Sequence, residues 1–170
     1  KADPRLGGSE MDLIAFTRDE DIWVMTTVGV ETQLTFCSRN KKKSDISCGI
    51  AEFVMQEEFH RFTNYYWAPS SPSRPQSALA TEKILYLQVS EAMVDLVVIP
   101  RQGMQPEYEE YRYPHTGTRN AVSDLQIVEF IPRQHEEPLH KRLWGRASLY
   151  KLFPWLEYIV RFGWLPDGER

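Results

Sequence analysis

Two adjacent carboxylates, Glu57 and Glu58, are the residues whose types and spacing point most directly to chemistry. Neighbouring carboxylates repel each other, and a wet surface tolerates such a pair, which is the interpretation that the local pattern favours. The functional alternative is that both bind one cation, because a protonated α-amine has three N–H donors and can bridge two carboxylates. In a shielded cavity each such charge-assisted hydrogen bond contributes on the order of 1.5–3 kcal/mol.

A catalytic nucleophile is not predicted in this chain. Serine hydrolases need a serine on a strained turn, a histidine base and a carboxylate, and the sequence has no G-x-S-x-G motif. Neither Ser9 nor Ser148 has glycines at both flanking positions of the motif, and none of the four histidines lies beside a convincing nucleophile. Hydrolysis by this chain alone is therefore not expected. Gly103 and Gly117 stand alone, so no phosphate-binding loop is predicted.

Metal and cofactor sites are not predicted either. His135 and His140 flank two glutamates, but their spacing, interrupted by Pro138, does not place both rings on one face of a helix. A solvated loop is the favoured interpretation of this segment. The three lysines at 41–43 are interpreted as a solvated loop tip, and a phosphate or nucleic-acid contact is the alternative.

Composition narrows the class of protein. The 170 residues are 42% hydrophobic and 26% charged, with a net charge of -4, as in an ordinary soluble domain. A dedicated nucleic-acid binder usually has a basic excess, so nucleic acid is not an expected partner. The longest apolar stretches, such as residues 93–99, are far shorter than the roughly 18 residues of a membrane span. We therefore expect no membrane partner, and the polar residues 1–10 do not resemble a signal peptide.

The chain has two cysteines, Cys37 and Cys48, and no Asn-x-Ser/Thr motif. Unpaired buried thiols are favoured, and a single disulfide is the alternative. Free thiols and the missing glycosylation motif together favour a reducing, cytoplasmic compartment.

Short apolar segments separated by turn residues predict an all-β fold. Strands are expected in residues 12–16, 22–26, 33–36, 50–55, 65–67, 84–89, 94–99, 125–131 and 158–164. We expect residues 84–89 and 94–99 to pair as a hairpin and residues 100–118 to be irregular. Gly29 predicts a hairpin turn, and residues 166–168, Pro-Asp-Gly, predict another turn. Residues 56–62, which include the two glutamates, are expected to form one or two helical turns.

Groups of strands recur about every 40 residues, a spacing that is typical of propeller blades. The sequence repeat is faint, so a sandwich remains an alternative. The predicted fold is all-β: antiparallel four-stranded blades of a partial β-propeller, about four of them, with a short helical insertion that carries the glutamate pair. Because an open arc of blades exposes strand edges, we expect the chain to be part of a larger ring.

The segment around the glutamate pair also resembles a known family. Residues 53–62, FVMQEEFHRF, followed by YYWAP at 65–69, resemble the glutamate-motif region of the dipeptidyl peptidase IV family, nearest to its cytosolic branch, dipeptidyl peptidases eight and nine. Further matches occur in the same order at residues 12–16, 21–24, 34–37, 84–86, 111–118 and 157–164. The resemblance covers nearly the whole chain.

The resemblance implies an eight-bladed N-terminal propeller joined to a C-terminal α/β-hydrolase domain. Residues 1–170 would be a portion of that propeller, and the hydrolase domain with its catalytic triad lies outside this chain. The full-length parent would be a serine dipeptidyl peptidase that removes Xaa-Pro or Xaa-Ala dipeptides from free N-termini. By residue-to-residue match, Glu57 and Glu58 would bind the α-ammonium group of the substrate. The expected partners are peptides with a free N-terminus, the hydrolase domain of the same protein, and a second copy in a homodimer.

Some positions depart from the family pattern. Tyr66 stands where relatives usually have a second tryptophan, Ala68 where the cytosolic branch tends to have cysteine, and His60 replaces an acidic residue. Ala121 replaces a proline, and an upstream arginine that contacts the substrate carbonyl in relatives has no counterpart that can be placed. An inactive family member, whose propeller serves only as an interaction module, is the main alternative, and a stand-alone β-sandwich binding domain is a weaker one.

Overall fold

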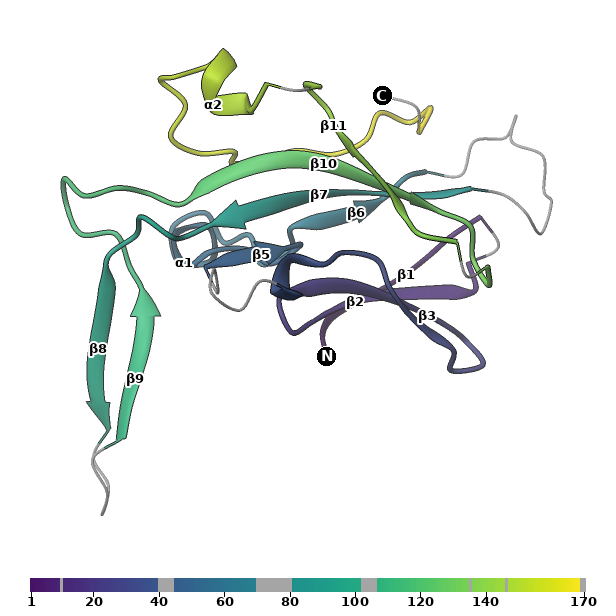
Figure 1. Ribbon diagram of the computed structural model, residues 1–170, viewed down its shortest axis with the longest axis horizontal. Helices are drawn as coiled ribbons and strands as arrows, with labels where there is room; N and C mark the ends of the chain where they lie inside the picture. Colours follow the sequence, from purple (N-terminus) through teal and green to yellow (C-terminus); the bar gives the residue numbers. More distant parts are fainter. Residues whose placement is uncertain are drawn as a thin grey trace.

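The computed structural model describes residues 1–9, 11–39, 45–69, 81–101, 107–134, 136–145 and 147–168. These residues form eleven strands, two short α-helices, of which α2 is Leu149–Leu152, and one 3-10 helix, so the predicted all-β class is confirmed. The strands make a four-stranded sheet, a five-stranded sheet and a two-stranded hairpin, all antiparallel (Figure 1). None of the described helices is long and apolar enough to cross a membrane.

The first sheet is a meander of β1 (Ala2–Gly7), β2 (Leu13–Arg18), β3 (Asp21–Thr26) and β4 (Glu31–Gln33). Asp19 and Glu20 form the two-residue loop between β2 and β3, and both have positive φ values, 52° and 66°. Positive φ at both loop positions matches the right-handed twist of the flanking strands. Gly29 lies in the predicted turn between β3 and β4, where its φ of 92° suits glycine.

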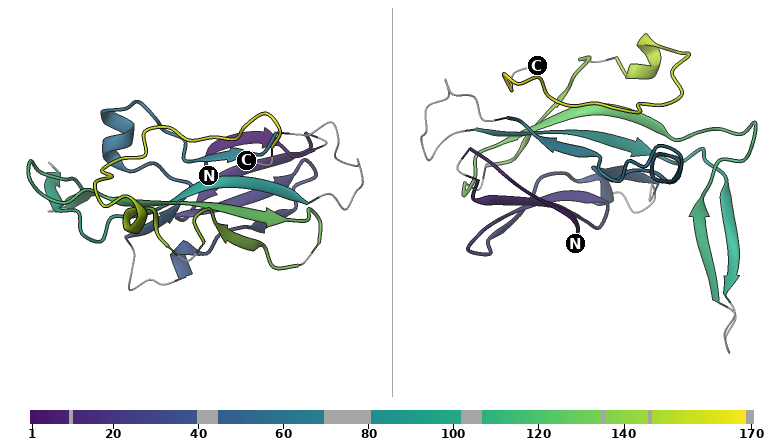
Figure 2. Two further views of the ribbon diagram at one scale, coloured as in Figure 1. Left: turned by 90° about the horizontal axis from the view of Figure 1, so that it is seen from above. Right: turned by 180° about the vertical axis from the view of Figure 1, so that it is seen from behind.

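The second sheet is built on two nine-residue strands, β7 (Glu82–Ser90) and β10 (Val122–Phe130), which pair along their full length. β11 (Leu139–Arg142) extends the sheet beyond β10. β5 (Ile46–Cys48) and β6 (Tyr65–Trp67) pair with different parts of β7. The third pair, β8 (Leu96–Arg101) and β9 (Glu107–Arg112), projects from the body as an arm (Figure 2).

Both faces of β7 are buried, so other parts of the chain pack against this strand from both sides. Ile84 and Tyr86 face the first sheet and join the main core with residues such as Ile22 and Val128. Leu85 and Leu87 face the other side, where the extended C-terminal segment around Ile159, Phe162 and Trp164 covers them. Because successive side chains of a strand alternate between faces, a strand buried on both sides reads as a continuous apolar run.

Several local expectations are wrong in ways that this packing explains. Residues 84–89 and 94–99 do not form a hairpin, because β7 pairs with β10. The partner of β8 is β9, which lies within residues 100–118, the segment expected to be irregular. A strand that is apolar on both faces is stabilised most at the centre of a sheet, whereas β8 is largely exposed. Residues 158–164 are extended but belong to none of the strands in the described part of the chain.

The two larger sheets, of four and five antiparallel strands, are consistent with blades of a partial propeller, and the described residues contain two sheets of this size. Residues that a 40-residue spacing assigned to further blades belong instead to the long strands β7 and β10 and to the projecting pair β8 and β9.

Cys37 and Cys48 form a disulfide, so the expectation of unpaired thiols is wrong. Cys37 begins the 3-10 helix η1 (Cys37–Arg39), and Cys48 ends β5. Asp21 holds the neighbouring turn, because its carboxylate accepts hydrogen bonds from the backbone N–H groups of Cys37 and Ser38 at 2.6 and 3.2 Å. The disulfide thus joins η1 to the end of β5. Residues 40–44, which connect them along the chain, lie outside the described residues. The predicted turn at residues 166–168 is confirmed, and Gly168 there has a φ of 67°.

Candidate functional site

The glutamate pair lies at the end of a single short helix, α1 (Phe53–Glu57). Glu52 caps the helix: its carboxylate oxygens accept hydrogen bonds from the backbone N–H groups of Val54 at 2.5 Å and Met55 at 3.1 Å. Met55 is buried and anchors the helix in the body. Glu57 is the last helical residue and Glu58 is the C-cap, so the predicted helical insertion is present but begins three residues earlier than residues 56–62.

The chain reverses direction after the helix, and the side chain of Arg61, which is only 6% exposed, stabilises this reversal. Its guanidinium donates hydrogen bonds to the Thr63 carbonyl at 3.1 Å, to the Asn64 side-chain oxygen and to the Ile159 carbonyl at 3.0 Å. Burial lowers the pKa of Arg61 from its ordinary value. Asn64 is fully buried and donates to the Ile50 carbonyl at 2.7 Å. This polar network fixes α1 relative to the second sheet and the C-terminal segment.

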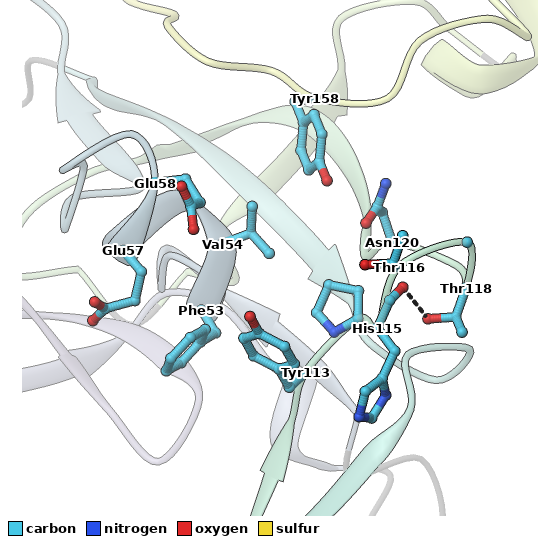
Figure 3. A pocket seen from close by; sticks show the side chains of 12 residues that line it. Phe53, Val54, Glu57, Glu58, Tyr113, His115, Thr116, Thr118, Asn120 and Tyr158 are labelled. Carbon is cyan, nitrogen blue, oxygen red and sulfur yellow. Dashed lines mark hydrogen bonds between the residues drawn. The ribbon is translucent and has the colours of Figure 1, made fainter.

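A cavity of about 310 Å³ opens beside the pair, and we call it the acidic cavity. Its walls come from α1, from the turn after β9, and from the C-terminal segment (Figure 3). The lining residues are Phe53, Val54, Glu57, Glu58, Tyr113, Pro114, His115, Thr116, Gly117, Thr118, Asn120 and Tyr158. Its volume is at the lower end of the range of about 300–1,000 Å³ for ligand pockets.

Aromatic contacts and hydrogen bonds hold the walls together. The ring of Phe53 meets Tyr113 edge to face, with centroids 5.2 Å apart, and Phe59 packs against Tyr158 at 5.6 Å. Asn120 donates a 2.8 Å hydrogen bond to Glu157, which ties the turn to the C-terminal segment. Burial, followed by the negative charges of Glu52, Glu157 and Glu58, raises the pKa of Tyr158. The phenol of Tyr158 therefore stays protonated at neutral pH and can donate a hydrogen bond.

Both Glu57 and Glu58 are exposed. Among the described residues, neither carboxylate has a hydrogen-bonding or ion-pairing partner. In Figure 3 the Glu58 carboxylate turns toward the side of Val54, whereas the Glu57 carboxylate points away from the Tyr113 wall. The two side chains therefore lie at one helix end without converging on a common point. An incoming cation can bring them together, because exposed glutamates change rotamer at little cost.

Residues on the far wall were not singled out by sequence reasoning. Tyr113, His115 and Asn120 are more than fifty residues from the pair, and Tyr158 is about a hundred residues away. The resemblance at residues 111–118 and 157–164 was the signal that could have drawn attention to three of them. His115 is positioned by Asp95, whose carboxylate lies 3.2 Å from its Nδ1 atom.

The other residues considered for metal or phosphate binding fall partly outside the described part of the chain. His135, Gly103 and the lysines at 41–43 lie outside the described residues. The Nδ1 atom of His140 lies 3.1 Å from the hydroxyl of Tyr86. Asp21, Cys37 and Cys48 place ligand atoms within 4.8 Å of one another, but both sulfur atoms are committed to the disulfide.

Comparison with known proteins gives consistent matches along the chain. Residues 4–170 match the family model described as the dipeptidyl peptidase IV (DPP IV) N-terminal region. The chain is 30% identical over 177 residues to dipeptidyl peptidase 8 of Homo sapiens, which covers 99% of this chain and 19% of that protein. Dipeptidyl peptidase 8 of Mus musculus is also 30% identical, with 99% and 20% covered.

A more distant match is inactive dipeptidyl peptidase 10 of Rattus norvegicus, which is 26% identical over 97 residues, or 55% of this chain and 11% of that protein. The chain spans about a fifth of the length of the dipeptidyl peptidase 8 proteins that it matches.

Proposed function

Because the chain belongs to the dipeptidyl peptidase IV family, within that family's N-terminal region, we propose that it is the substrate-gating propeller portion of a serine dipeptidyl peptidase. In this proposal the full-length protein removes Xaa-Pro and Xaa-Ala dipeptides from free N-termini. Glu57 and Glu58 bind the α-ammonium group of the substrate. The serine, histidine and carboxylate that cleave the peptide bond come from a hydrolase domain of the same protein.

The observation that carries the proposal is the state of the glutamate pair. Two adjacent carboxylates lie at the end of one helix, on the wall of a 310 Å³ cavity, and neither is neutralised by another described residue. Like charges held together without a partner favour a cation that can neutralise both. An α-ammonium has three donors, so it can bond to both carboxylates and keep one donor for another acceptor. The Asn120 side-chain oxygen on the opposite wall is a suitable third acceptor.

In this proposal the distance between the glutamate pair and the catalytic serine sets the length of the released fragment. A substrate whose N-terminus is bound at the pair can present only the peptide bond at a fixed distance from that end. If the catalytic serine lies at the distance of two residues, the enzyme releases dipeptides. Binding energy at a group remote from the reacting bond is thereby used to position it.

Three further parts of the proposal concern the whole protein. Residues 1–170 are a portion of the propeller, the ring is completed by other parts of the protein, and the full-length protein forms a homodimer. A cytoplasmic location rests only on the missing Asn-x-Ser/Thr motif, since the disulfide between Cys37 and Cys48 favours an oxidising compartment instead. The oxidation state of the two cysteines in protein isolated under thiol-blocking conditions distinguishes these locations.

A second candidate function is a propeller that serves only as an interaction module. The match to inactive dipeptidyl peptidase 10 favours it, because a relative named as inactive shares part of this region. The intact glutamate pair favours the enzyme, because an interaction module does not need two uncompensated carboxylates beside a cavity.

Hydrolysis of Gly-Pro p-nitroanilide by the full-length protein tests the proposal, with the 170-residue chain assayed beside it. We expect release of nitroaniline by the full-length protein and none by the 170-residue chain. If the folded full-length protein cleaves neither this substrate nor its Gly-Ala analogue, the result contradicts the peptidase proposal and favours the interaction module.

A further inference from the structure

A second cavity, of about 330 Å³, lies between β6 and the C-terminal segment, and we call it the aromatic cavity. Its walls include four aromatic side chains and two arginines: Tyr66, Trp67, Phe162, Trp164, Arg61 and Arg161. Of the described residues, none lines both this cavity and the acidic cavity. The two cavities are therefore separate, and the acidic cavity is lined by glutamates whereas the aromatic cavity is lined by arginines.

The charged groups that line the aromatic cavity are two guanidinium groups, and Glu52, which acts on Arg61 electrostatically, is not among the lining residues. Among the described residues, no acidic side chain lines the cavity, and neither Arg61 nor Arg161 forms an ion pair. Arg61 is buried, and its Nε atom has no hydrogen-bond partner among the described residues. Burial is the main cause that lowers the pKa of Arg61, Tyr66 and Glu52 act in the opposite direction, and the positive charge of Arg161 adds to the lowering. An anion in this cavity would compensate both charges.

The aromatic walls are held rigidly and present ring surfaces rather than polar atoms. The indole N–H of Trp164 donates to the Tyr66 carbonyl at 3.0 Å, and that of Trp67 donates to the Arg5 carbonyl at 3.1 Å. Gly7 is required beside Trp67, because a Cβ atom there would lie 2.4 Å from the indole ring. Both indole donors are thus committed to the protein, and the two partly buried rings line the cavity with their apolar surface.

Tyr66 supplies a neutral donor to the same cavity. Its ring meets Phe162 edge to face, with centroids 5.0 Å apart, and Phe162 in turn lies 5.3 Å from the guanidinium of Arg61. Among the described residues, the Tyr66 hydroxyl has no hydrogen-bond partner. The cavity therefore combines an exposed guanidinium, a free hydroxyl donor and aromatic walls.

We propose that the aromatic cavity binds a carboxylate attached to an aromatic group, with the guanidinium of Arg161 and the hydroxyl of Tyr66 bonding to the carboxylate. Arg61 contributes positive charge from beneath, and the indole rings of Trp67 and Trp164 pack against the aromatic group. A guanidinium binds a carboxylate through two parallel hydrogen bonds, which favours this anion over a spherical one. A cationic ligand is disfavoured by both arginines, and a small inorganic anion would leave the aromatic walls unused.

Two sources could supply this chemistry: a free aromatic carboxylic acid, or the C-terminus of a peptide that ends in an aromatic residue. Phenylacetate represents the first source and N-acetylphenylalanine the second. N-acetylphenylalanine amide has the same ring without the charge, and phenethylamine has the opposite charge. Isothermal titration calorimetry of the full-length protein with each compound measures binding directly, and quenching of tryptophan fluorescence reports on Trp67 and Trp164.

We expect saturable binding of at least one carboxylate, at least tenfold weaker binding of the amide, and none of phenethylamine at this site. Tighter binding of phenylacetate identifies a free acid as the ligand, and tighter binding of N-acetylphenylalanine identifies a peptide C-terminus. Arg161→Gln is expected to weaken carboxylate binding at least tenfold, and Tyr66→Phe by a smaller factor. Arg119→Gln removes the same charge from an exposed arginine that lines neither cavity, and it should leave the affinity unchanged.

The inference is independent of the proposed peptidase function. Glu57→Gln should not change carboxylate affinity, whatever it does to peptide hydrolysis. The absence of saturable binding by both carboxylates would overturn the proposal, as would equal affinities of the wild-type protein and the Arg161→Gln variant. Equal binding of the acid and the amide would likewise overturn it, because the cavity would then be only an apolar hollow.

Discussion

The Nη2 atom of Arg61 donates a 3.0 Å hydrogen bond to the carbonyl oxygen of Ile159, which lies 98 residues later in the chain. Ile159 stands between Tyr158, which lines the acidic cavity, and Arg161, which lines the aromatic cavity. One buried side chain near the glutamate pair thus positions the segment that supplies walls to both cavities.

Arg61→Met should destabilise the protein and loosen both cavities. Methionine retains the apolar stem but leaves the carbonyl oxygens of Thr63 and Ile159 and the Asn64 side chain without a donor. We expect the free energy of unfolding to fall by about 2–3 kcal/mol, measured by urea denaturation. Arg119→Gln is the control, since its side chain is exposed and should be neutral within about 0.5 kcal/mol. An unchanged denaturation midpoint for Arg61→Met would contradict the structural role of the hydrogen bond.

Glu57→Gln and Glu58→Gln should each impair peptide cleavage by the full-length protein without unfolding it. Glutamine has nearly the shape of glutamate but not the charge that binds an α-ammonium. We expect kcat/KM for Gly-Pro p-nitroanilide to fall at least about 100-fold, or roughly 2.7 kcal/mol of transition-state stabilisation. The melting temperature should stay within error because both side chains are exposed. Glu136→Gln is a matched control at an exposed glutamate outside both cavities, and full activity of both test variants would remove the assigned role.

The part of the site that is local in sequence was predictable. Glu57 and Glu58 are neighbours, and a short helix around them followed from good helix formers without strand alternation. The helix boundary was misplaced because its start depends on the Glu52 side chain, which caps the backbone of Val54 and Met55. Glutamate is not among the preferred N-cap residues, so the type of residue at position 52 did not indicate a helix start.

Long-range pairings could not be predicted. The apolar run of β7 is compatible with several partner strands, and its partner in the structure is β10, whose apolar side chains extend the clusters on both faces of the sheet. The far wall of the acidic cavity has the same origin, since Tyr113, which follows β9, and Tyr158, in the C-terminal segment, reach α1 only through long-range packing. The disulfide was missed because cysteine count and spacing do not determine whether two sulfur atoms meet.

Reduction of the disulfide between Cys37 and Cys48 should lower the stability of the folded protein. Cys37 and Cys48 are separated by 11 residues, and closing a loop of that length contributes about 2–3 kcal/mol by restricting the unfolded chain. We expect dithiothreitol to lower the free energy of unfolding by this amount in urea denaturation. The Cys37→Ser/Cys48→Ser double variant should be equally destabilised and should not respond to dithiothreitol. Identical stability of the wild-type protein with and without reductant would show that the bond contributes nothing.

Glu91 should make the protein less stable as the pH rises from about 5 to 8. Burial raises the pKa of Glu91 from 4.5 to about 7, and the negative charges of Glu52, Asp45 and Glu20 act in the same direction against the charge of Arg112. A raised pKa means that the folded protein binds this proton more tightly than the unfolded chain. The stabilisation is therefore complete below about pH 4.5 and is lost as the pH passes through about 7.

Glu91→Gln isolates this contribution, because glutamine keeps the neutral shape at every pH. The burial of Glu91 is incomplete, so we expect the difference in unfolding free energy between variant and wild type to grow by about 1–2 kcal/mol from pH 5 to pH 8. Burial lowers the pKa of His140 and therefore opposes the trend below about 6.5, but its contribution cancels in the difference. Urea denaturation at half-unit pH steps measures the curve, and parallel curves for the two proteins would contradict the buried proton on Glu91.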